Sequence, residues 1–343
     1  MKRRILISIF MLVIMLIIPL VISMPQQSRM TFFEKNNENV DEEIKEEENE
    51  KVQDEDYNEN DKFLLLDKSN DEVIRVSGRD FMRGAIATEM PITFEIEALK
   101  AQAVAAFTYY TKAKIDERLK KREELKGADF EVNTKEWLYW VPKKEMQKKW
   151  AESFEKYYRK LEEVVDSVFN VIIENEGKPI VATYHAISSG KTEKSSDIFG
   201  GDSLSYLKSV PSPGDILDPN YQTKKEISVE EVRSKLEEKF QDISFPKNKE
   251  DWFQIVDKTP SGTAKKIQIG NAECSGKEIR ALFSLRSSNF DIESSNGRFI
   301  FIVRGYGHGV GMSQVGAQSM AKQGLDYEQI LAWYYPGTVI KRK

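Results

Sequence analysis

Three carboxylates lie close together in the stretch ATEMPITFEIEALKAQAVAAFTYYT, residues 87–111. Glu95 and Glu97 fall in the first turn of the alanine-rich helix that this stretch predicts, where a carboxylate favours the helix dipole whatever its function. Glu89 differs, because it precedes Met90–Pro91 in what reads as the turn before that helix, among apolar neighbours. Apolar surroundings disfavour the charged form of a carboxyl group, and a carboxyl that keeps its proton can act as a general acid. Glu89 is therefore the candidate acid, with a structural acid before a helix as the alternative.

A second group of such residues lies in the glycine-rich sequence RGYGHGVGMSQVGAQ, residues 304–318. Its alternating glycines, at 305, 307, 309 and 311, do not match the spacing of a dinucleotide-binding turn. Such glycines let the backbone approach either a ligand or another segment of the chain, so a binding loop and a tight strand-to-helix connection both remain open. His308, inside this loop, is a candidate to hydrogen-bond a substrate or to orient a catalytic group.

A third motif, HAISSGKTE at residues 185–193, ends like a phosphate-binding P-loop, with Gly190, Lys191 and Thr192 in the last three positions. A P-loop also needs a glycine five residues before Gly190, and His185 stands there. The motif is therefore not a nucleotide site.

Few side chains are available for a transition metal, because the chain has one cysteine, Cys274, and two histidines, His185 and His308. A zinc site of cysteine and histidine ligands is not expected, and an internal disulfide is impossible. An all-carboxylate metal site remains open. Residues 63–343 carry a net charge of +1 without a basic stripe, which argues against a nucleic-acid partner. No cofactor is predicted.

The elements that must position these residues mix helices with short strands. Strands at 63–66 and 73–76 flank the turn sequence DKSND, and a long helix follows Pro91 with Gly127 as its stop. The following patterns predict a helix over 143–168, a hairpin in 171–187, a helix opened by Ser228, several strands over 253–303, and final helices at 313–324 and 326–337. Without regular β-α alternation, this order favours an α+β fold, as a single mixed domain of long helices and short β-hairpins over 63–343.

The N-terminal part has a different character. Three basic residues at positions 2–4 precede an apolar run from Ile5 to Met24, long enough to cross a bilayer and without a small-residue cleavage site. Residues 1–24 are therefore predicted to be a transmembrane helix, with the basic end cytoplasmic and the domain outside the cell membrane. Residues 34–62 hold fourteen acidic residues against four lysines, so 25–62 is predicted to be an acidic, disordered tether.

Five segments together resemble the stage II sporulation protein D family. They occur in the family's order and spacing over nearly all of residues 63–343: EMPITFEIEALKAQAVAAFTYYT, ATYHAISSGKTEKSSDIFGG, YLKSVPSPGD, RALFSLRSSNF and GYGHGVGMSQVGAQSMAKQG. The resemblance implies a lytic transglycosylase that cleaves peptidoglycan glycan strands during engulfment of the forespore. It also implies a location in the mother-cell membrane, facing the space between the two membranes.

The same resemblance assigns residues and partners. The family's catalytic glutamate, in its E-M-P motif, corresponds to Glu89, and its tyrosine-x-lysine motif corresponds to Tyr206 and Lys208. Further substrate-binding candidates come from the second and last motifs, namely His185, Ser189, Lys191 and His308. The implied substrate is denuded glycan, prepared by the amidase stage II sporulation protein P, and a further implied partner is stage II sporulation protein M.

Two departures from the family pattern bear on activity. Phe107 stands where the family commonly has an arginine, so a fixed charge expected near the site is missing. The segment GADFEVNTKEWLYWVPKKEM, residues 127–146, lacks the cysteine and histidine with which some members bind zinc, so no zinc is predicted. Because related proteins enhance a cell-wall amidase, a non-catalytic enhancer or binding partner is the alternative function.

Overall fold

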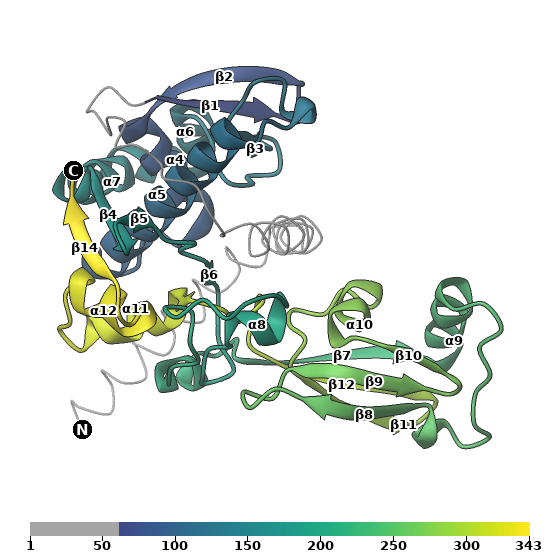
Figure 1. The fold of residues 1–343 in the computed structure, drawn as a ribbon. Helices are drawn as coiled ribbons and strands as arrows, with labels where there is room; N and C mark the ends of the chain where they lie inside the picture. Colours follow the sequence, from purple (N-terminus) through teal and green to yellow (C-terminus); the bar gives the residue numbers. More distant parts are fainter. Residues whose placement is uncertain (1–61) are drawn as a thin grey trace.

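The computed structural model describes residues 62–343, which form two units, and it confirms the mixed α and β character of the chain (Figure 1). The first unit comprises residues 62–221 and 305–343, and the second comprises the intervening residues 222–304. Each has its own hydrophobic cluster, so these residues build two main cores where one was expected. The predicted anchor, 1–24, and the tether up to residue 61 lie outside the described residues. Within 62–343 no helix combines the length and apolar character needed to cross a membrane.

The first unit opens with the predicted hairpin. Strands β1 (Lys62–Asp67) and β2 (Glu72–Ser77) pair antiparallel, and Asp71 in their turn has φ +62°. Strand β3 (Phe130–Val132) joins the other edge of β1 in parallel.

Helix α4 (Gly78–Glu89) was not predicted from the sequence. Its glycines, Gly78 and Gly84, weaken the helical pattern, because glycine disfavours helix interiors by about 1 kcal/mol. Tertiary packing requires a glycine at position 84, since a Cβ at Gly84 would lie 2.2 Å from the Trp140 ring. The Ser77 side chain caps the helix by accepting a hydrogen bond from the Asp80 backbone.

Helix α5 (Ile96–Leu119) is the predicted alanine-rich helix, and it is buried along most of its length. It ends at Leu119, before the predicted stop at Gly127. Its charged last turn is followed by a turn and a short 3₁₀ helix, η1 (Glu123–Leu125). The predicted helix over 143–168 is broken in two, as α6 (Lys143–Trp150) and α7 (Phe154–Val168) around η2 (Ala151–Ser153). The break lies at Ala151, whose φ of +43° no α-helix accommodates.

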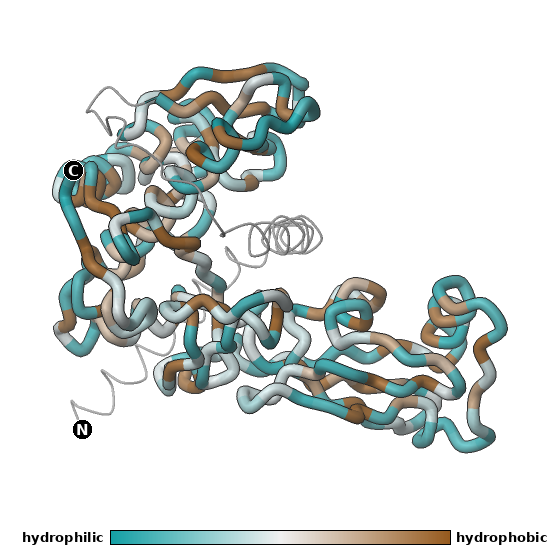
Figure 2. The backbone as a smooth tube through the Cα atoms, viewed as in Figure 1, coloured by the Kyte–Doolittle hydropathy of each residue, from teal (hydrophilic) through white to brown (hydrophobic). Residues whose placement is uncertain are grey.

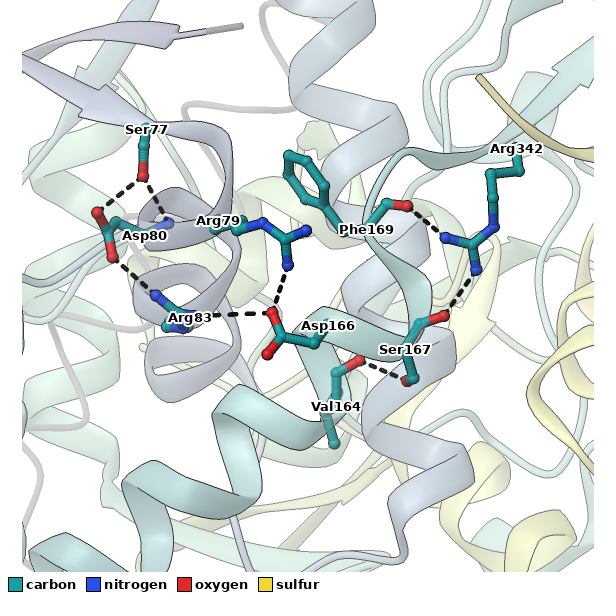
Figure 3. Close-up of polar contacts among 9 residues, drawn as sticks. All are labelled: Ser77, Arg79, Asp80, Arg83, Val164, Asp166, Ser167, Phe169 and Arg342. Atoms are coloured by element: carbon teal, nitrogen blue, oxygen red, sulfur yellow. Dashed lines mark hydrogen bonds and ion pairs between the residues drawn. The ribbon is translucent and has the colours of Figure 1, made fainter. Parts of the chain in front are cut away.

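Ion pairs fix α4 against α7 (Figure 3). Arg79 and Arg83 both approach Asp166, and Arg83 also pairs with Asp80 at 3.0 Å. The Arg79 guanidinium lies 4.1 Å from the centroid of the Phe169 ring. Arg342 donates to the carbonyl oxygens of Phe169 and Ser167, which joins the C-terminal strand to the end of α7. The helix that ends at Glu89 is thus held at its first turns.

The C-terminal segment returns to this unit. The predicted hairpin forms as β4 (Val171–Asn175) and β5 (Lys178–Pro179), and β14 (Val339–Arg342) pairs antiparallel with the free edge of β4. Helices α11 (Gln314–Lys322) and α12 (Tyr327–Tyr334) begin after the predicted caps, Ser313 and Asp326. The remaining short elements connect the units and are β6 (Tyr184–His185), α8 (Ser195–Ile198), η3 (Pro213–Leu217) and β13 (Met312–Ser313).

The second unit consists of two three-stranded antiparallel sheets with two helices. One sheet has the order β11-β12-β7, from β7 (Gln222–Ser228), β11 (Phe290–Ser295) and β12 (Arg298–Arg304). The other has the order β10-β9-β8, from β8 (Phe253–Lys258), β9 (Ala264–Ile269) and β10 (Ala272–Cys274). Helix α9 (Val229–Lys239) has the predicted Ser228 cap, whereas α10 (Gly276–Leu282) was missed although Ser275 and Glu278 form a capping box. Hydrophobic residues recur along the strands of both units (Figure 2).

Candidate functional site

Glu89 is the last residue of α4, and its side chain is half-buried. The prediction that Glu89 lies in the turn before the long helix is therefore wrong, because that turn begins one residue later, at Met90. The Met90 backbone N–H closes the helix on the carbonyl oxygen of Ile86. The C-terminal end of a helix carries a partial negative charge, which disfavours an anion placed there. The end of α4 itself therefore does not stabilise a negative charge at Glu89.

Three tyrosines share electrostatic interactions with Glu89. They are Tyr110 on α5, Tyr139 in the loop after β3, and Tyr184 on β6. Burial raises the pKa of each phenol, and the nearby Glu89 charge raises it further, so all three stay neutral. Neutral phenols can donate hydrogen bonds to a carboxylate or to a sugar oxygen. The sequence analysis missed these tyrosines, since a tyrosine in an apolar stripe reads as core.

Tyr139 is held in an unfavourable backbone conformation. Its φ is +69°, and that of Trp137, two residues earlier, is +56°. Bulky residues rarely adopt this left-handed region, and such strain persists only where the surrounding structure enforces it. Here Leu138 between them exchanges backbone hydrogen bonds with Asn133. This pairing places the Tyr139 ring against the first core and beside the small cluster of Ile187 and Tyr306.

The glycine-rich loop packs tightly on residues 183–193, the segment that contains β6. All four alternating glycines have positive φ, between 73° and 109°. A Cβ at Gly305 would lie 2.7 Å from the Ile187 oxygen, and one at Gly311 would lie 2.0 Å from the Thr183 oxygen. Added Cβ atoms at Gly307 and Gly309 would similarly meet the side chains of His185 and Glu193, at 2.8 and 2.9 Å. Of the two interpretations left open, close approach to another chain segment accounts for these glycines.

The two histidines lie together, with ring centroids 5.8 Å apart. His185 Nδ1 faces the Val310 carbonyl oxygen at 3.2 Å, and His308 Nδ1 accepts a hydrogen bond from the Val310 N–H at 3.0 Å. Burial lowers the pKa of His185 to about 4 and, together with the neighbouring His185, lowers that of His308 as well. Both rings are therefore neutral at physiological pH, which suits hydrogen bonding and not charge attraction to a substrate.

The remaining predicted binding residues differ in exposure. Tyr206 is buried, and its hydroxyl accepts a hydrogen bond from the Val181 N–H at 3.2 Å, as a core tyrosine would. Lys208 is exposed, whereas Lys191 and Ser189 are half-buried, and the Ser189 hydroxyl donates to the Ser261 carbonyl oxygen at 2.9 Å. Their part in substrate binding stays a prediction.

Phe107 is part of the first core. It is 5% exposed, and its ring centroid lies 6.0 Å from those of Phe63 and Phe169. An aromatic cluster thus occupies the position at which the family resemblance led us to expect an arginine. Glu97, at the start of α5, pairs with Lys100 at 2.8 Å and accepts a hydrogen bond from the Tyr327 backbone, so it has a structural role.

Two fully buried carboxylates were also missed. Asp215 accepts hydrogen bonds from the hydroxyls of Ser188 and Ser313, and Glu193 accepts from those of Thr259 and Thr263. Burial raises the pKa of both groups against the effect of these donors. A charged residue type by itself gives no sequence signal of burial. Over residues 62–343, no three His, Cys, Asp or Glu side chains are grouped as a metal site would require.

Comparison with known proteins finds matches to both units of the chain. The stage II sporulation protein family matches residues 67–174, which include Glu89, and a domain of unknown function matches 215–311, which include the second unit. The chain is 32% identical over 272 residues to stage II sporulation protein D of Bacillus subtilis (strain 168), covering 79% of this chain and 76% of the relative. The corresponding protein of Bacillus amyloliquefaciens is 31% identical with the same coverage. An amidase enhancer of Bacillus subtilis is 24% identical, over 76% of this chain and 40% of its own length. This chain therefore belongs to the stage II sporulation protein D family, whose members act in sporulation.

Proposed function

We propose that the protein is a lytic transglycosylase that cleaves the bond between N-acetylmuramic acid and N-acetylglucosamine in denuded peptidoglycan. One observation carries the proposal: the family's glutamate position is occupied by Glu89, half-buried at the C-terminal end of α4 with three neutral tyrosines in its electrostatic surroundings. A single carboxyl group suffices for this reaction because the substrate supplies its own nucleophile.

In the first step, protonated Glu89 donates to the glycosidic oxygen as the bond from C1 of the muramoyl residue breaks. In the second step, the Glu89 carboxylate accepts the proton of the muramoyl C6 hydroxyl, whose oxygen attacks C1 and closes a 1,6-anhydro ring. Water is not consumed, and Glu89 ends the cycle protonated. Such general acid-base catalysis contributes about 10²–10⁴ in rate.

The other predicted residues are assigned to binding. Lys208 is exposed and would pair with the lactyl carboxylate of the muramoyl residue. Neutral Tyr184 and Tyr139 would donate hydrogen bonds around Glu89, while His185 and His308, tied to Val310, would hold the loop that borders the site. Tyr206 would act through its position in the core.

The decisive experiment is product analysis. Purified protein is incubated with peptide-free glycan strands, and the products are separated by mass spectrometry. The proposal predicts anhydro-muramoyl ends that vanish in Glu89→Gln. Ordinary reducing ends would indicate hydrolysis by water and contradict the proposed role of the C6 hydroxyl.

A second candidate function is a non-catalytic enhancer of a cell-wall amidase. Two observations favour it: the similarity to an amidase enhancer, and the aromatic cluster that contains Phe107 in place of the family's arginine. Under this alternative, wild-type protein leaves the strands intact but raises the rate of an added amidase, and Glu89→Gln does the same.

Partners and location follow from the same proposal. Residues 1–24 would anchor the protein in the mother-cell membrane, with the two units outside the cytoplasm. There it would act with the amidase stage II sporulation protein P and with stage II sporulation protein M. Co-purification of the full chain with each protein from sporulating cells tests this assignment.

A further inference from the structure

Glu193 connects the two units of the molecule. It lies in the segment after β6, in the first unit, and is 2% exposed. Its Oε1 accepts hydrogen bonds from the hydroxyls of Thr259 and Thr263, at 2.8 and 2.6 Å. Both threonines lie in the turn between β8 and β9. The tip of this second-unit hairpin therefore donates two hydrogen bonds to a first-unit carboxylate.

The surrounding contacts make this joint specific. Ser261, at the centre of the hairpin tip, donates from its hydroxyl to the Thr192 carbonyl oxygen at 2.8 Å. Its own carbonyl oxygen accepts from the side chains of Ser189 and Asn289, at 2.9 and 2.8 Å. The tip is thus bonded to consecutive parts of the segment 189–193.

On its other side, Glu193 supports the glycine-rich loop. Its backbone N–H donates to the Gly309 carbonyl oxygen at 2.8 Å, and a Cβ at Gly309 would lie 2.9 Å from Glu193 Cγ. Gly309 directly follows His308. Glu193 therefore stands between the hairpin tip, which its carboxylate contacts, and the loop that carries His308, which its backbone and Cγ contact.

Burying this carboxylate is costly unless donors satisfy it, and the threonine hydroxyls would lose their acceptor if it were removed. The chain also crosses between the units beside the loop, where the Gly305 N–H donates to the Tyr221 carbonyl oxygen at 2.8 Å. The hairpin tip adds contacts between the units away from this crossing.

We propose that Glu193 is a positioning residue through which the β8–β9 hairpin of the second unit fixes the glycine-rich loop, and with it His308, relative to Glu89. The second unit then belongs to the catalytic apparatus without supplying a reacting group. This inference builds on the proposed function, but its structural part stands independently of any activity.

The test compares Glu193→Ala and Glu193→Gln in the full chain. An amide oxygen in the glutamine variant can still accept from both threonines, so Gln should preserve the joint that Ala destroys. Glu174→Ala is the matched control, because Glu174 is similarly buried, at 5% exposure, but lies on β4 and pairs with Lys343. Thr259→Val combined with Thr263→Val removes the donors instead, and it replaces Glu193→Ala if that variant does not fold.

Backbone hydrogen exchange is the first readout. We expect amides of residues 306–310 to exchange at least about tenfold faster in Glu193→Ala, with exchange in β12 unchanged, and wild-type rates in Glu193→Gln and in the control. Unchanged exchange of the loop in Glu193→Ala, or equal loosening in the control, would overturn the proposal.

Kinetics on glycan strands are the second readout. We expect kcat to fall about tenfold in Glu193→Ala with KM within about twofold, and Gln to restore most of it. A faster-exchanging loop with undiminished kcat would refute the link to Glu89. If wild-type protein shows no transglycosylase activity, the proposed function fails, while the exchange result still decides whether the joint exists.

Discussion

The end of helix α4 and the contact between the two units place acidic groups in different settings. The first unit leaves Glu89 half-exposed at a helix end, near tyrosines that burial keeps neutral. At the contact with the second unit, Glu193 is surrounded by hydroxyl donors and excluded from solvent. A reactive acid needs access and a labile proton, whereas a structural acid needs donors and burial. The comparison therefore separates the group that we propose as the acid from the group that we propose as a positioning residue.

Among the substitutions that test this comparison, the one at Glu89 should have the largest effect, and that effect is on the reaction rate. Glu89→Gln should lower the rate on denuded strands by about 10²–10⁴, because the amide can neither donate the proton nor accept it back. Its melting temperature should stay within about 2 °C of wild type, since the side chain is half-exposed. A strongly lowered melting temperature would show that Glu89 is structural, like Glu193.

The next largest expected effect is on stability, and it differs between a glycine of the first unit, Gly311, and one of the second unit, Gly297. Gly311→Ala should destabilise the protein by more than about 2 kcal/mol, because φ is +73° and the new Cβ would lie 2.0 Å from the Thr183 oxygen. Gly297→Ala, in the turn of the second unit, has φ +74° and no heavy atom within 4 Å, so strain alone should cost about 1 kcal/mol. Chemical denaturation measures both, and equal losses would disprove the role of close approach.

A third effect appears on acidification. The folded protein binds a proton at His185 with a pKa of about 4, whereas the unfolded chain does so near 6.5, so unfolding takes up protons between these values. Stability is retained above pH 6.5 and should fall by roughly 3 kcal/mol as the pH drops toward 4. His185→Gln should reduce this slope in urea titrations at stepped pH, and His308, whose pKa burial also lowers, contributes the remainder. An unchanged slope would place the titration on other groups.

The smallest expected effect is the loss of stability in Tyr206→Phe, which tests whether Tyr206 is a core residue or a direct substrate contact. Tyr206→Phe removes the acceptor of the Val181 N–H and should cost about 1–2 kcal/mol of stability. If the tyrosine acts only through the core, KM on glycan strands stays within about twofold of wild type. A KM raised tenfold with unchanged stability would instead make its hydroxyl a direct substrate contact.

Much of the local structure could be predicted from the sequence. The β1–β2 hairpin, the buried stripe of α5, and the caps at Ser228, Ser313 and Asp326 follow from periodicity and turn chemistry, which act over a few residues. Helix α4 could not, because Gly84 is tolerated there only through its contact with Trp140. The positive φ values at Ala151 and Tyr139 are likewise backbone conformations that helical and strand periodicity do not reveal.

The sequence by itself determined the candidate acid, the long helix that became α5 and the capped helices α9, α11 and α12, and that the glycines at 305–311 permit a close approach. Only the tertiary structure decided what the backbone approaches there, which tyrosines surround Glu89, and that Glu193 is buried between two units. The physical reason is that propensity and periodicity are local, whereas burial and electrostatic environment depend on contacts between residues far apart in the chain.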